Sequence, residues 1–323
     1  MIKDTIIAGL AAFALSLVLT KLGIPVLHRL KFGQYIREEG PKDHQKKSGT
    51  PTMGGIMFLI AASAVSACYA PKYPKIIPVA AFMLLFGLIG FTDDYIKVVK
   101  KHNEGLKPGQ KLAMQIAVTA AFAVYLFMHP DISTDMLVPF TGDFESGLYL
   151  KLGWLFIPAV FIIVLGTDNG VNLTDGLDGL CTSVTIIVAI FFAAVTIRCD
   201  IPMAPIGGIT AGALMGFLMY NAYPARVFMG DTGSLALGGF VSSFALMTGM
   251  PLFIVPVGII YLTEAVSVIM QVSYFKATHG KRIFRMAPIH HHFELGGMSE
   301  TRIVAVFTAV TVIASLLAFI GFC

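Results

Sequence analysis

Acidic and amide side chains are most densely placed in the segment 168–179, which reads DNGVNLTDGLDG and contains no basic residue. Asn172, Asp175 and Asp178 are spaced by three, so a helical turn would bring them to one side. Oxygen ligands of this kind suit Mg²⁺ and can also hydrogen-bond a sugar or a base. The calcium-loop spacing and its final Glu are absent, which excludes an EF-hand. A solvated turn is the alternative interpretation.

Two adjacent carboxylates, Asp93 and Asp94, close an apolar run in the segment FTDDYIK. Carboxylates at a membrane boundary are costly unless they are paired, solvated or bound to metal. Neighbouring helical residues point about 100° apart, so we expect the two to have different roles. Lys97 is a natural partner for Asp94 one turn away, with Asp93 facing a substrate phosphate. The opposite assignment of the two aspartates stays open. A further alternative is that the pair merely ends the apolar run in water.

Two lysines, three hydroxyls and several glycines precede an apolar run in KKSGTPTMGG, residues 46–55. Lys47, Thr52 and the free N–H groups of a following helix could hold a phosphate. A basic anchor at the membrane surface is the alternative.

Asp231 is the one acid of the segment 221–234, NAYPARVFMGDTGS, and lies between glycines that let a backbone approach its ligand. Phe228 in the same segment could stack on a flat base, although a loop Phe can also dip into lipid.

Three consecutive histidines, His290, His291 and His292, lie in MAPIHHHFE and follow Lys281 and Arg285. Histidines in line suggest metal ligation, phosphate contact or proton transfer. A zinc site needs a fourth donor, and no thiolate is near in sequence. The cationic setting favours contact with a diphosphate.

The elements that position these residues are membrane helices, because 56% of the chain is hydrophobic and only 13% is charged, with mean hydropathy +0.79. Soluble domains carry about 25% charged residues. We therefore predict an all-α, polytopic integral membrane protein, a single transmembrane catalytic domain over 1–323. About ten apolar runs are candidates for spans: 5–27, 53–70, 76–92, 112–129, 152–166, 179–197, 203–220, 235–249, 252–275 and 303–322.

The basic residues are unevenly distributed between the two sides that ten spans would create. Seventeen of the 23 Lys and Arg fall in the alternate connections that also contain the five polar segments, and five fall on the other side. The positive-inside rule therefore places the five segments in the cytoplasm and both termini outside. Glu264 is the one acid within a predicted span. The external segment 130–151 is predicted to be a small hairpin or loop.

The polar segments together resemble the phospho-N-acetylmuramoyl-pentapeptide transferase family (MraY) of the polyprenyl-phosphate N-acetylhexosamine-1-phosphate transferase superfamily. The resemblance rests on Asp93-Asp94, NLTDGLDGL at 172–180, NAYPARVFMGDTGS at 221–234 and MAPIHHHFE at 286–294. The first two motifs would fit the superfamily broadly, whereas the histidine motif is specific to the muramoyl-peptide branch.

The resemblance implies a Mg²⁺-dependent enzyme of the bacterial cytoplasmic membrane. It would transfer phospho-N-acetylmuramoyl-pentapeptide from its UDP-linked precursor to undecaprenyl phosphate, giving lipid I and UMP for peptidoglycan synthesis. Whether attack is direct or passes through a covalent enzyme intermediate stays open, as does which aspartate, if any, is the base. A homodimer is also implied.

The same resemblance assigns the residues. The catalytic set is Asp93, Asp94, Asp231, His290 and His291, with Asp231 as the metal ligand. The substrate-binding set is Lys47, Thr52, Lys97, Lys111, Asn172, Asp175, Asp178, Asn221, Phe228 and His292. A related transferase that uses UDP-N-acetylglucosamine is the nearer alternative, and a membrane transporter is the more distant one, since transporters place ionisable groups within their spans.

Overall fold

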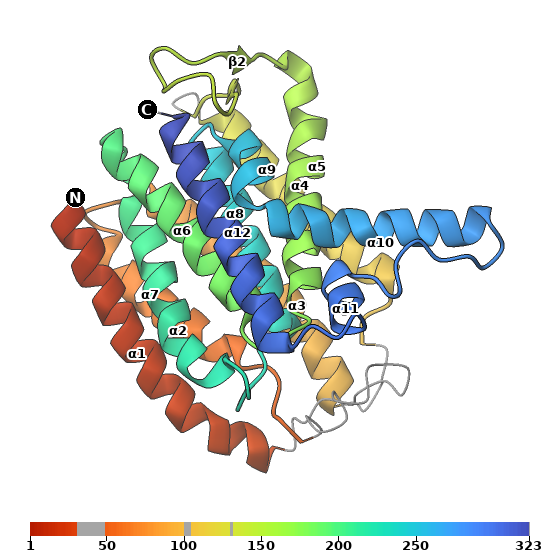
Figure 1. The fold of residues 1–323 in the computed structure, drawn as a ribbon. Helices are drawn as coiled ribbons and strands as arrows, with labels where there is room; N and C mark the ends of the chain where they lie inside the picture. Colours follow the sequence, from red (N-terminus) through yellow and green to blue (C-terminus); the bar gives the residue numbers. More distant parts are fainter. Residues whose placement is uncertain (31–48, 100–104, 130–131, 323) are drawn as a thin grey trace.

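The chain is mostly helical in a computed structural model that describes residues 1–30, 49–99, 105–129 and 132–322 (Figure 1). The long helices are α1 (Ile2–Arg29), α2 (Gly55–Tyr69), α3 (Ile76–Val99), α4 (Pro108–Met128), α5 (Phe156–Thr174), α6 (Leu180–Arg198), α7 (Ala204–Asn221), α8 (Gly230–Met247), α10 (Ile259–Ala277) and α12 (Glu300–Ile320). Short elements complete it: β1 (Met136–Leu137), β2 (Tyr149–Leu150), η2 (Gly153–Leu155), η3 (Pro251–Phe253), α9 (Ile254–Val257) and α11 (Ile289–Glu294).

Each predicted apolar run coincides with a helix, but not every helix is a candidate span by itself. In the described part of the chain, six helices are long and apolar enough to cross a membrane: α1, α3, α4, α5, α6 and α12. A seventh candidate is the run predicted over 252–275, which is not one straight helix. It breaks at Gly258, and its two parts are bent by 83°, so α10 runs across the other helices in Figure 1. The protein is therefore a polytopic membrane protein.

Several helices extend past their predicted apolar runs at the end that holds the polar segments, most of all three of them. α3 continues to Val99, α5 continues to Thr174, and α8 begins at Gly230. Asp168 therefore lies inside α5, although the sequence predicted it in a connection between spans. Glu264 is consequently not the one acid that lies within a membrane helix. A search for apolar runs does not detect the polar ends of helices, because their side chains face the site and not the lipid.

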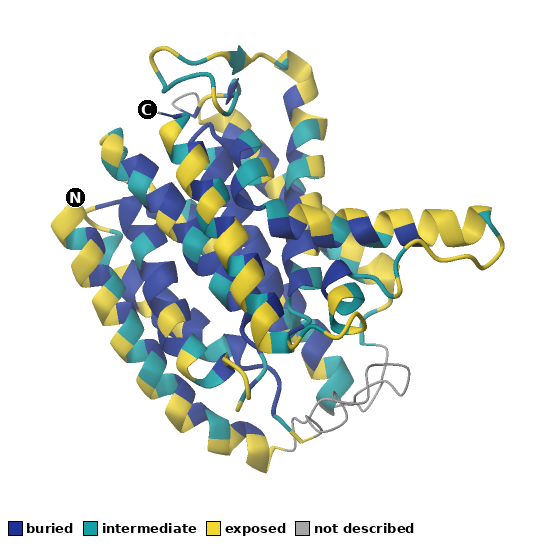
Figure 2. Cartoon of the chain, in the orientation of Figure 1, coloured by how far each residue is buried: buried dark blue, intermediate teal, exposed yellow. Residues whose placement is uncertain are grey.

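α8 lies at the centre of the bundle, and all but its terminal residues are buried (Figure 2). α3 and α5 pack against it, while α1 packs along α7 at the periphery. Small residues allow the α1–α7 approach, because a Cβ built on Gly212 would lie 2.0 Å from the Gly9 carbonyl oxygen. Close backbone approach through small residues is a common way to pack helices in membranes.

The end of the molecule opposite the polar segments carries the predicted external hairpin. β1 and β2 pair antiparallel, with Met136 opposite Leu150. At the same end Asp4 accepts hydrogen bonds from Lys72 Nζ at 2.7 Å and Tyr73 Oη at 2.6 Å, which ties α1 to the α2–α3 turn. Lys72 is thus held by a carboxylate, which explains how a basic side chain is accommodated on the less basic side.

Candidate active site

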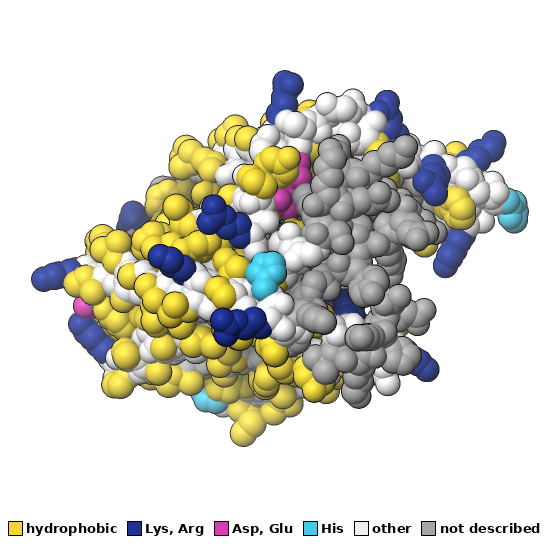
Figure 3. Space-filling model, turned by 90° about the horizontal axis from the view of Figure 1, so that it is seen from below, with side chains coloured by type: hydrophobic (Ala, Val, Ile, Leu, Met, Phe, Trp, Pro, Cys, Tyr) yellow, Lys and Arg dark blue, Asp and Glu magenta, His cyan; other side chains and the backbone are white. Residues whose placement is uncertain are grey.

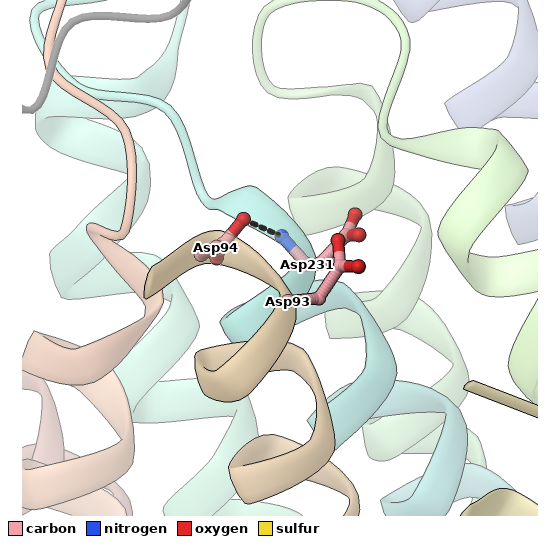
Figure 4. Close-up of side chains that lie close together, drawn as sticks. All are labelled: Asp93, Asp94 and Asp231. Atoms are coloured by element: carbon pink, nitrogen blue, oxygen red, sulfur yellow. Dashed lines mark hydrogen bonds between the residues drawn. The ribbon is translucent and has the colours of Figure 1, made fainter. Parts of the chain in front are cut away.

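Three carboxylates meet at the lower end of the bundle in Figure 1. Asp93 and Asp94 lie near the end of α3, and Asp231 lies in the first turn of α8. One ligand oxygen from each can be chosen such that all three lie within 4.8 Å of one another. The carboxylates of Asp93 and Asp231 lie side by side, while Asp94 points the other way (Figure 4). Two adjacent acids therefore have the different orientations that the sequence predicted.

Asp94 anchors the start of α8. Its buried carboxylate accepts the Thr232 N–H at 2.8 Å, the Thr232 hydroxyl at 2.6 Å and the Asp231 N–H at 3.2 Å. The two N–H donors are backbone groups of a first helical turn, which has no intrahelical partners for them. Gly230 makes the approach possible: it has a φ of 72°, and a Cβ there would lie 2.6 Å from Asp94 Oδ2 and 2.9 Å from Thr52 Oγ1.

Asp93, and not Asp94, is the partner of Lys97. The Lys97 ammonium forms an ion pair with the buried Asp93 carboxylate one turn earlier on α3, and Asp93 Oδ1 accepts the Leu106 N–H at 2.8 Å. The pairing of Lys97 with Asp94 expected first is therefore wrong, and Lys97 pairs with Asp93 instead. The reason is the start of α8, whose N–H groups take Asp94 away from the lysine.

Asp231 lies where the charges of the site converge. Its Oδ2 atom lies 2.9 Å from Lys97 Nζ and 3.1 Å from Lys111 Nζ. Its Oδ1 atom accepts a hydrogen bond from Asn172 Nδ2 at 3.0 Å. The structure thus brings together four residues predicted for the site from α3, α4, α5 and α8.

The carboxylate cluster fits a hard divalent cation. Asp93 and Asp231 present their oxygens side by side, and a nearby cation stabilises like charges held this close. Two lysines neutralise them here, and Mg²⁺ prefers carboxylate oxygens of this kind, usually one or two per ion together with substrate phosphates. Asp231 and Asp93 are the residues whose oxygens face the shared space, whereas Asp94 is committed to α8.

The segment 172–178 does not form one helical face, contrary to the prediction. α5 ends at Thr174, so only Asn172 lies on the helix, while Asp175 and Asp178 lie on the turn that follows. Asp178 accepts the Ala225 N–H at 2.9 Å and thereby joins this turn to the segment 221–234. Burial raises the pKa of the Asp175 carboxyl well above its usual range, and the carboxylates of Asp231, Asp94 and Asp178 add to the effect. A protonated carboxyl can donate as well as accept a hydrogen bond.

Backbone pairing holds the segment 221–234 against residues 51–55. The Phe228 N–H donates to the Pro51 carbonyl at 2.8 Å, and the Gly54 N–H donates to the Phe228 carbonyl at 2.9 Å. Phe228 is partly exposed. Asn221 is buried: its Oδ1 accepts from Thr182 and its Nδ2 donates to the Val227 carbonyl at 3.1 Å, so it shapes the segment from within. Lys47 lies outside the described residues.

The three histidines of α11 have three different environments. His290 is buried, with Nδ1 at 3.0 Å from Glu264 Oε2 on α10. His291 Nδ1 lies 3.0 Å from Glu294 Oε2. His292 Nδ1 accepts the Arg285 N–H at 3.1 Å, which fixes the preceding loop. One imidazole is thus buried, and two lie nearer the surface.

Two polar contacts near the site were not predicted. Gln115 Nε2 donates to the fully buried Asp168 Oδ2 at 2.5 Å, one turn along α4 from Lys111. Glu264 contacts His290, and its signal was its position as a charged residue within an apolar run. Asp168 was visible in the sequence, but its partner was not, because Gln115 reaches it only through the packing of α4 on α5.

The lower face of the molecule carries many basic side chains. In the view from below, Lys and Arg side chains are spread over the face and its margins, and an acidic patch shows among them (Figure 3). This distribution suits anionic ligands that approach an acidic centre.

Comparison with known proteins finds one family throughout. Residues 76–249 match the model of glycosyl transferase family 4, and residues 47–59 match a phospho-N-acetylmuramoyl-pentapeptide-transferase signature. The protein of that name from Acetivibrio thermocellus is 49% identical over 320 residues, covering 98% of this chain and 95% of the relative. The protein from Clostridium novyi is 48% identical over 316 residues, covering 97% of this chain and 95% of the relative. The protein from Caldicellulosiruptor bescii is 46% identical over 316 residues, covering 98% of this chain and 96% of the relative.

Proposed function

The chain belongs to the phospho-N-acetylmuramoyl-pentapeptide-transferase family, and from that premise we propose how its residues carry out the transfer. The reaction moves phospho-N-acetylmuramoyl-pentapeptide from its UDP-linked precursor to undecaprenyl phosphate, yielding lipid I and UMP for peptidoglycan synthesis. The observation that carries the proposal is the cluster of Asp93, Asp94 and Asp231 with two lysines at one end of a membrane-embedded bundle. A soluble polyanion and a lipid phosphate can meet only at such a boundary.

We infer ten membrane crossings, with both termini outside and the site in the cytoplasm. The central helices α7 and α8 are surrounded by other helices, so they need less apolar surface than a lipid-facing span does. α2, with 15 residues, is about 22 Å long at a rise of about 1.5 Å per residue, and a span this short is accommodated by local thinning of the bilayer. The excess of Lys and Arg at the end that holds the site supports the orientation.

Cations are needed because both substrates carry phosphate. Lys97 and Lys111 contact Asp231, and we propose that they turn to the substrate phosphates when these bind. Bound at Asp231, Mg²⁺ would neutralise phosphate charge and favour attack on the sugar-linked phosphorus. The undecaprenyl phosphate has a second pKa of about 6, so it is already mostly deprotonated at neutral pH and needs little help from a base. Positioning and electrostatics therefore account for much of the catalysis.

The nucleotide pocket is proposed to lie between the turn 175–178 and the segment 221–228. Asn172, Asp175 and Asp178 offer polar contacts, Asn221 shapes the segment, and Phe228 stacks on uracil. Thr52 lies beside Gly230 and Asp94, where it can contact a phosphate.

The proposed stacking of Phe228 on uracil can be tested separately. Phe228→Ala should weaken binding of the UDP-linked substrate by about 1–3 kcal/mol, which is the range for stacking of bases on aromatic side chains. KM and the inhibition constant of UMP measure it. Unchanged values of both would exclude the stacking role.

His290 and His291 are proposed to contact the diphosphate, with His292 binding substrate less directly. Arg285 and Lys281 keep this region cationic. Alanine at His290 or His291 should lower turnover. The melting temperature should change little at the partly exposed His291 and more at the buried His290, which lies against the buried Glu264. A structural zinc site would instead be lost to a zinc-selective chelator and not restored by Mg²⁺.

UMP release tests the function directly. Purified protein in detergent is given undecaprenyl phosphate, Mg²⁺ and either UDP-N-acetylmuramoyl-pentapeptide or UDP-N-acetylglucosamine. We expect release of UMP and a lipid-linked product with the first nucleotide sugar only. Release with the second alone would favour the related transferase. A homodimer in the bacterial cytoplasmic membrane is also proposed, and light scattering of the detergent complex measures its mass.

A further inference from the structure

Glu264 and His290 form a charged contact in the interior that the reaction as described above does not use. Glu264 lies on α10 and is 0% exposed, and His290 lies on α11 and is 1% exposed. The Nδ1–Oε2 distance is 3.0 Å. An isolated buried carboxylate is costly, so it is retained in an interior only where a partner compensates it.

The other side of the imidazole faces the acidic turn. A Cβ built on Gly176 would lie 2.2 Å from His290 Nε2, so the ring rests directly on the backbone between Asp175 and Leu177. His290 Nε2 is buried and has no hydrogen-bond partner among the described residues. A buried donor or acceptor without a partner costs about 1–3 kcal/mol, so this nitrogen needs a partner that the described residues do not supply.

The Glu264 carboxylate and the His290 ring are within ion-pair distance, but neither Glu264 oxygen accepts a hydrogen bond from the described residues. A carboxylate next to one ring nitrogen fixes which nitrogen carries the proton and how the ring is turned.

We propose that Glu264 is a positioning residue for His290. It holds the Nδ1 side of the ring, so that Nε2 faces the turn 175–178 and meets the diphosphate of the bound UDP-linked substrate. This rests on the contact between His290 and the diphosphate proposed above. Glu264 itself touches no substrate and acts only through the imidazole.

A double-mutant cycle separates this role from a general effect on the fold. Glu264→Gln keeps the shape and removes the charge, and partners that orient a ligating or reacting His typically contribute about 10- to 100-fold. We expect kcat for UMP release to fall by that factor, with KM for UDP-N-acetylmuramoyl-pentapeptide changed less than about twofold. In the His290→Ala background the same substitution should cause no further loss, because coupled residues are not additive.

Ser267→Ala is the matched control on the same helix. Ser267 is buried one turn away, and its hydroxyl donates to the Glu264 backbone carbonyl at 2.7 Å. It should leave kcat at the wild-type value. A similar loss in this variant would mean that α10 responds to any buried polar change and would overturn the proposal.

Gly176→Ala provides a second test, from the opposite side of the ring, that does not require a stable Glu264 variant. Its methyl group would displace the imidazole in the wild-type protein but would fit into the space left by His290→Ala. We expect a loss of kcat in the first background and none in the second.

The outcomes distinguish the two proposals. Full activity of His290→Ala would remove the diphosphate contact and Glu264's role together. If His290→Ala is impaired but Glu264→Gln is fully active, the His290 contact stands and the role of Glu264 is refuted. The same holds if the losses of kcat multiply in both double variants.

Discussion

At the residue scale, Asp231 differs from the two acids of α3 in the number of cations it faces. Both Lys97 and Lys111 approach the same oxygen, while Asn172 binds the other. Removing this charge would leave two ammonium groups without their shared partner. The same residue is thus the best candidate for the metal ligand and the point from which both lysines are oriented.

Asp231→Asn should therefore lower turnover by about 100-fold or more, the scale seen when a preorganised electrostatic group is removed. The measurement is UMP release in saturating Mg²⁺. A second readout does not depend on activity: Mg²⁺ should raise the melting temperature of the wild-type protein, because ligands that bind the folded state stabilise it. The variant should show no such rise. A rise equal to that of the wild type would exclude Asp231 as a ligand.

Asp93 and Asp94 should respond unequally to the same change. Asp94→Asn weakens the acceptor of three hydrogen bonds that start α8, so it should lower the free energy of unfolding by about 1–3 kcal/mol as well as turnover. Asp93→Asn should lower turnover with a smaller change in melting temperature. Thermal melts with paired kinetic assays compare them. Two mild and equal losses would instead mean that the pair merely ends α3 in water.

At the element scale, the face of α7 toward α1 is made of glycines four residues apart. Cβ atoms on Gly208, Gly212 and Gly216 would lie 2.6, 2.0 and 2.5 Å from atoms of α1. This interface has no room for even one methyl group, and the two helices must separate if one is added.

Gly212→Ala should consequently destabilise the protein by about 1–3 kcal/mol, the usual cost of overpacking, as measured by thermal unfolding in detergent. Gly166→Ala is the matched control, because Gly166 lies within α5 and its Cβ would meet no atom within 4 Å. It should be neutral or gain up to about 1 kcal/mol from helix propensity. Equal melting temperatures for the two variants would show that the α1–α7 contact is looser than described.

The elements themselves were largely predictable, and their ends were not. Apolar runs locate helices in a membrane protein because lipid allows little else. The true start of α8 depends on Asp94, which belongs to another helix, so no local pattern of residues 221–234 could reveal it. The bend before α10 does have a local signal in the sequence, because Pro256 and Gly258 both interrupt the apolar run.

At the scale of the whole molecule, the site was predictable from charge and motif, whereas its internal contacts were not. Counting Lys and Arg in connections placed the polar segments at one end, and the structure brings the described ones together there. The pairing of Gln115 with Asp168 and of His290 with Glu264 depends on which helices are neighbours. That order is set by three-dimensional packing, which spacing along the chain does not contain.

Orientation in the membrane can be tested with two single cysteines in a background where Cys68, Cys181, Cys199 and Cys323 are replaced. Glu145→Cys lies on the exposed β1–β2 connection, and Lys281→Cys lies after α10 at the other end. A membrane-impermeant maleimide should label the first in intact cells and the second only after permeabilisation. The opposite pattern would invert the proposed topology.

The packing of α1 on α7 and of α3 on α8 has a consequence for how the protein is made. Translation delivers α1 and α3 to the bilayer before α7 and α8 exist, so the early helices first lie there without these partners. The acidic cluster first becomes complete when the ribosome has passed Asp231, and the imidazole that rests on Gly176 arrives later still. Biosynthesis therefore cannot yield a partly active nascent chain: catalytic competence arrives late, when distant segments of the finished bundle dock together.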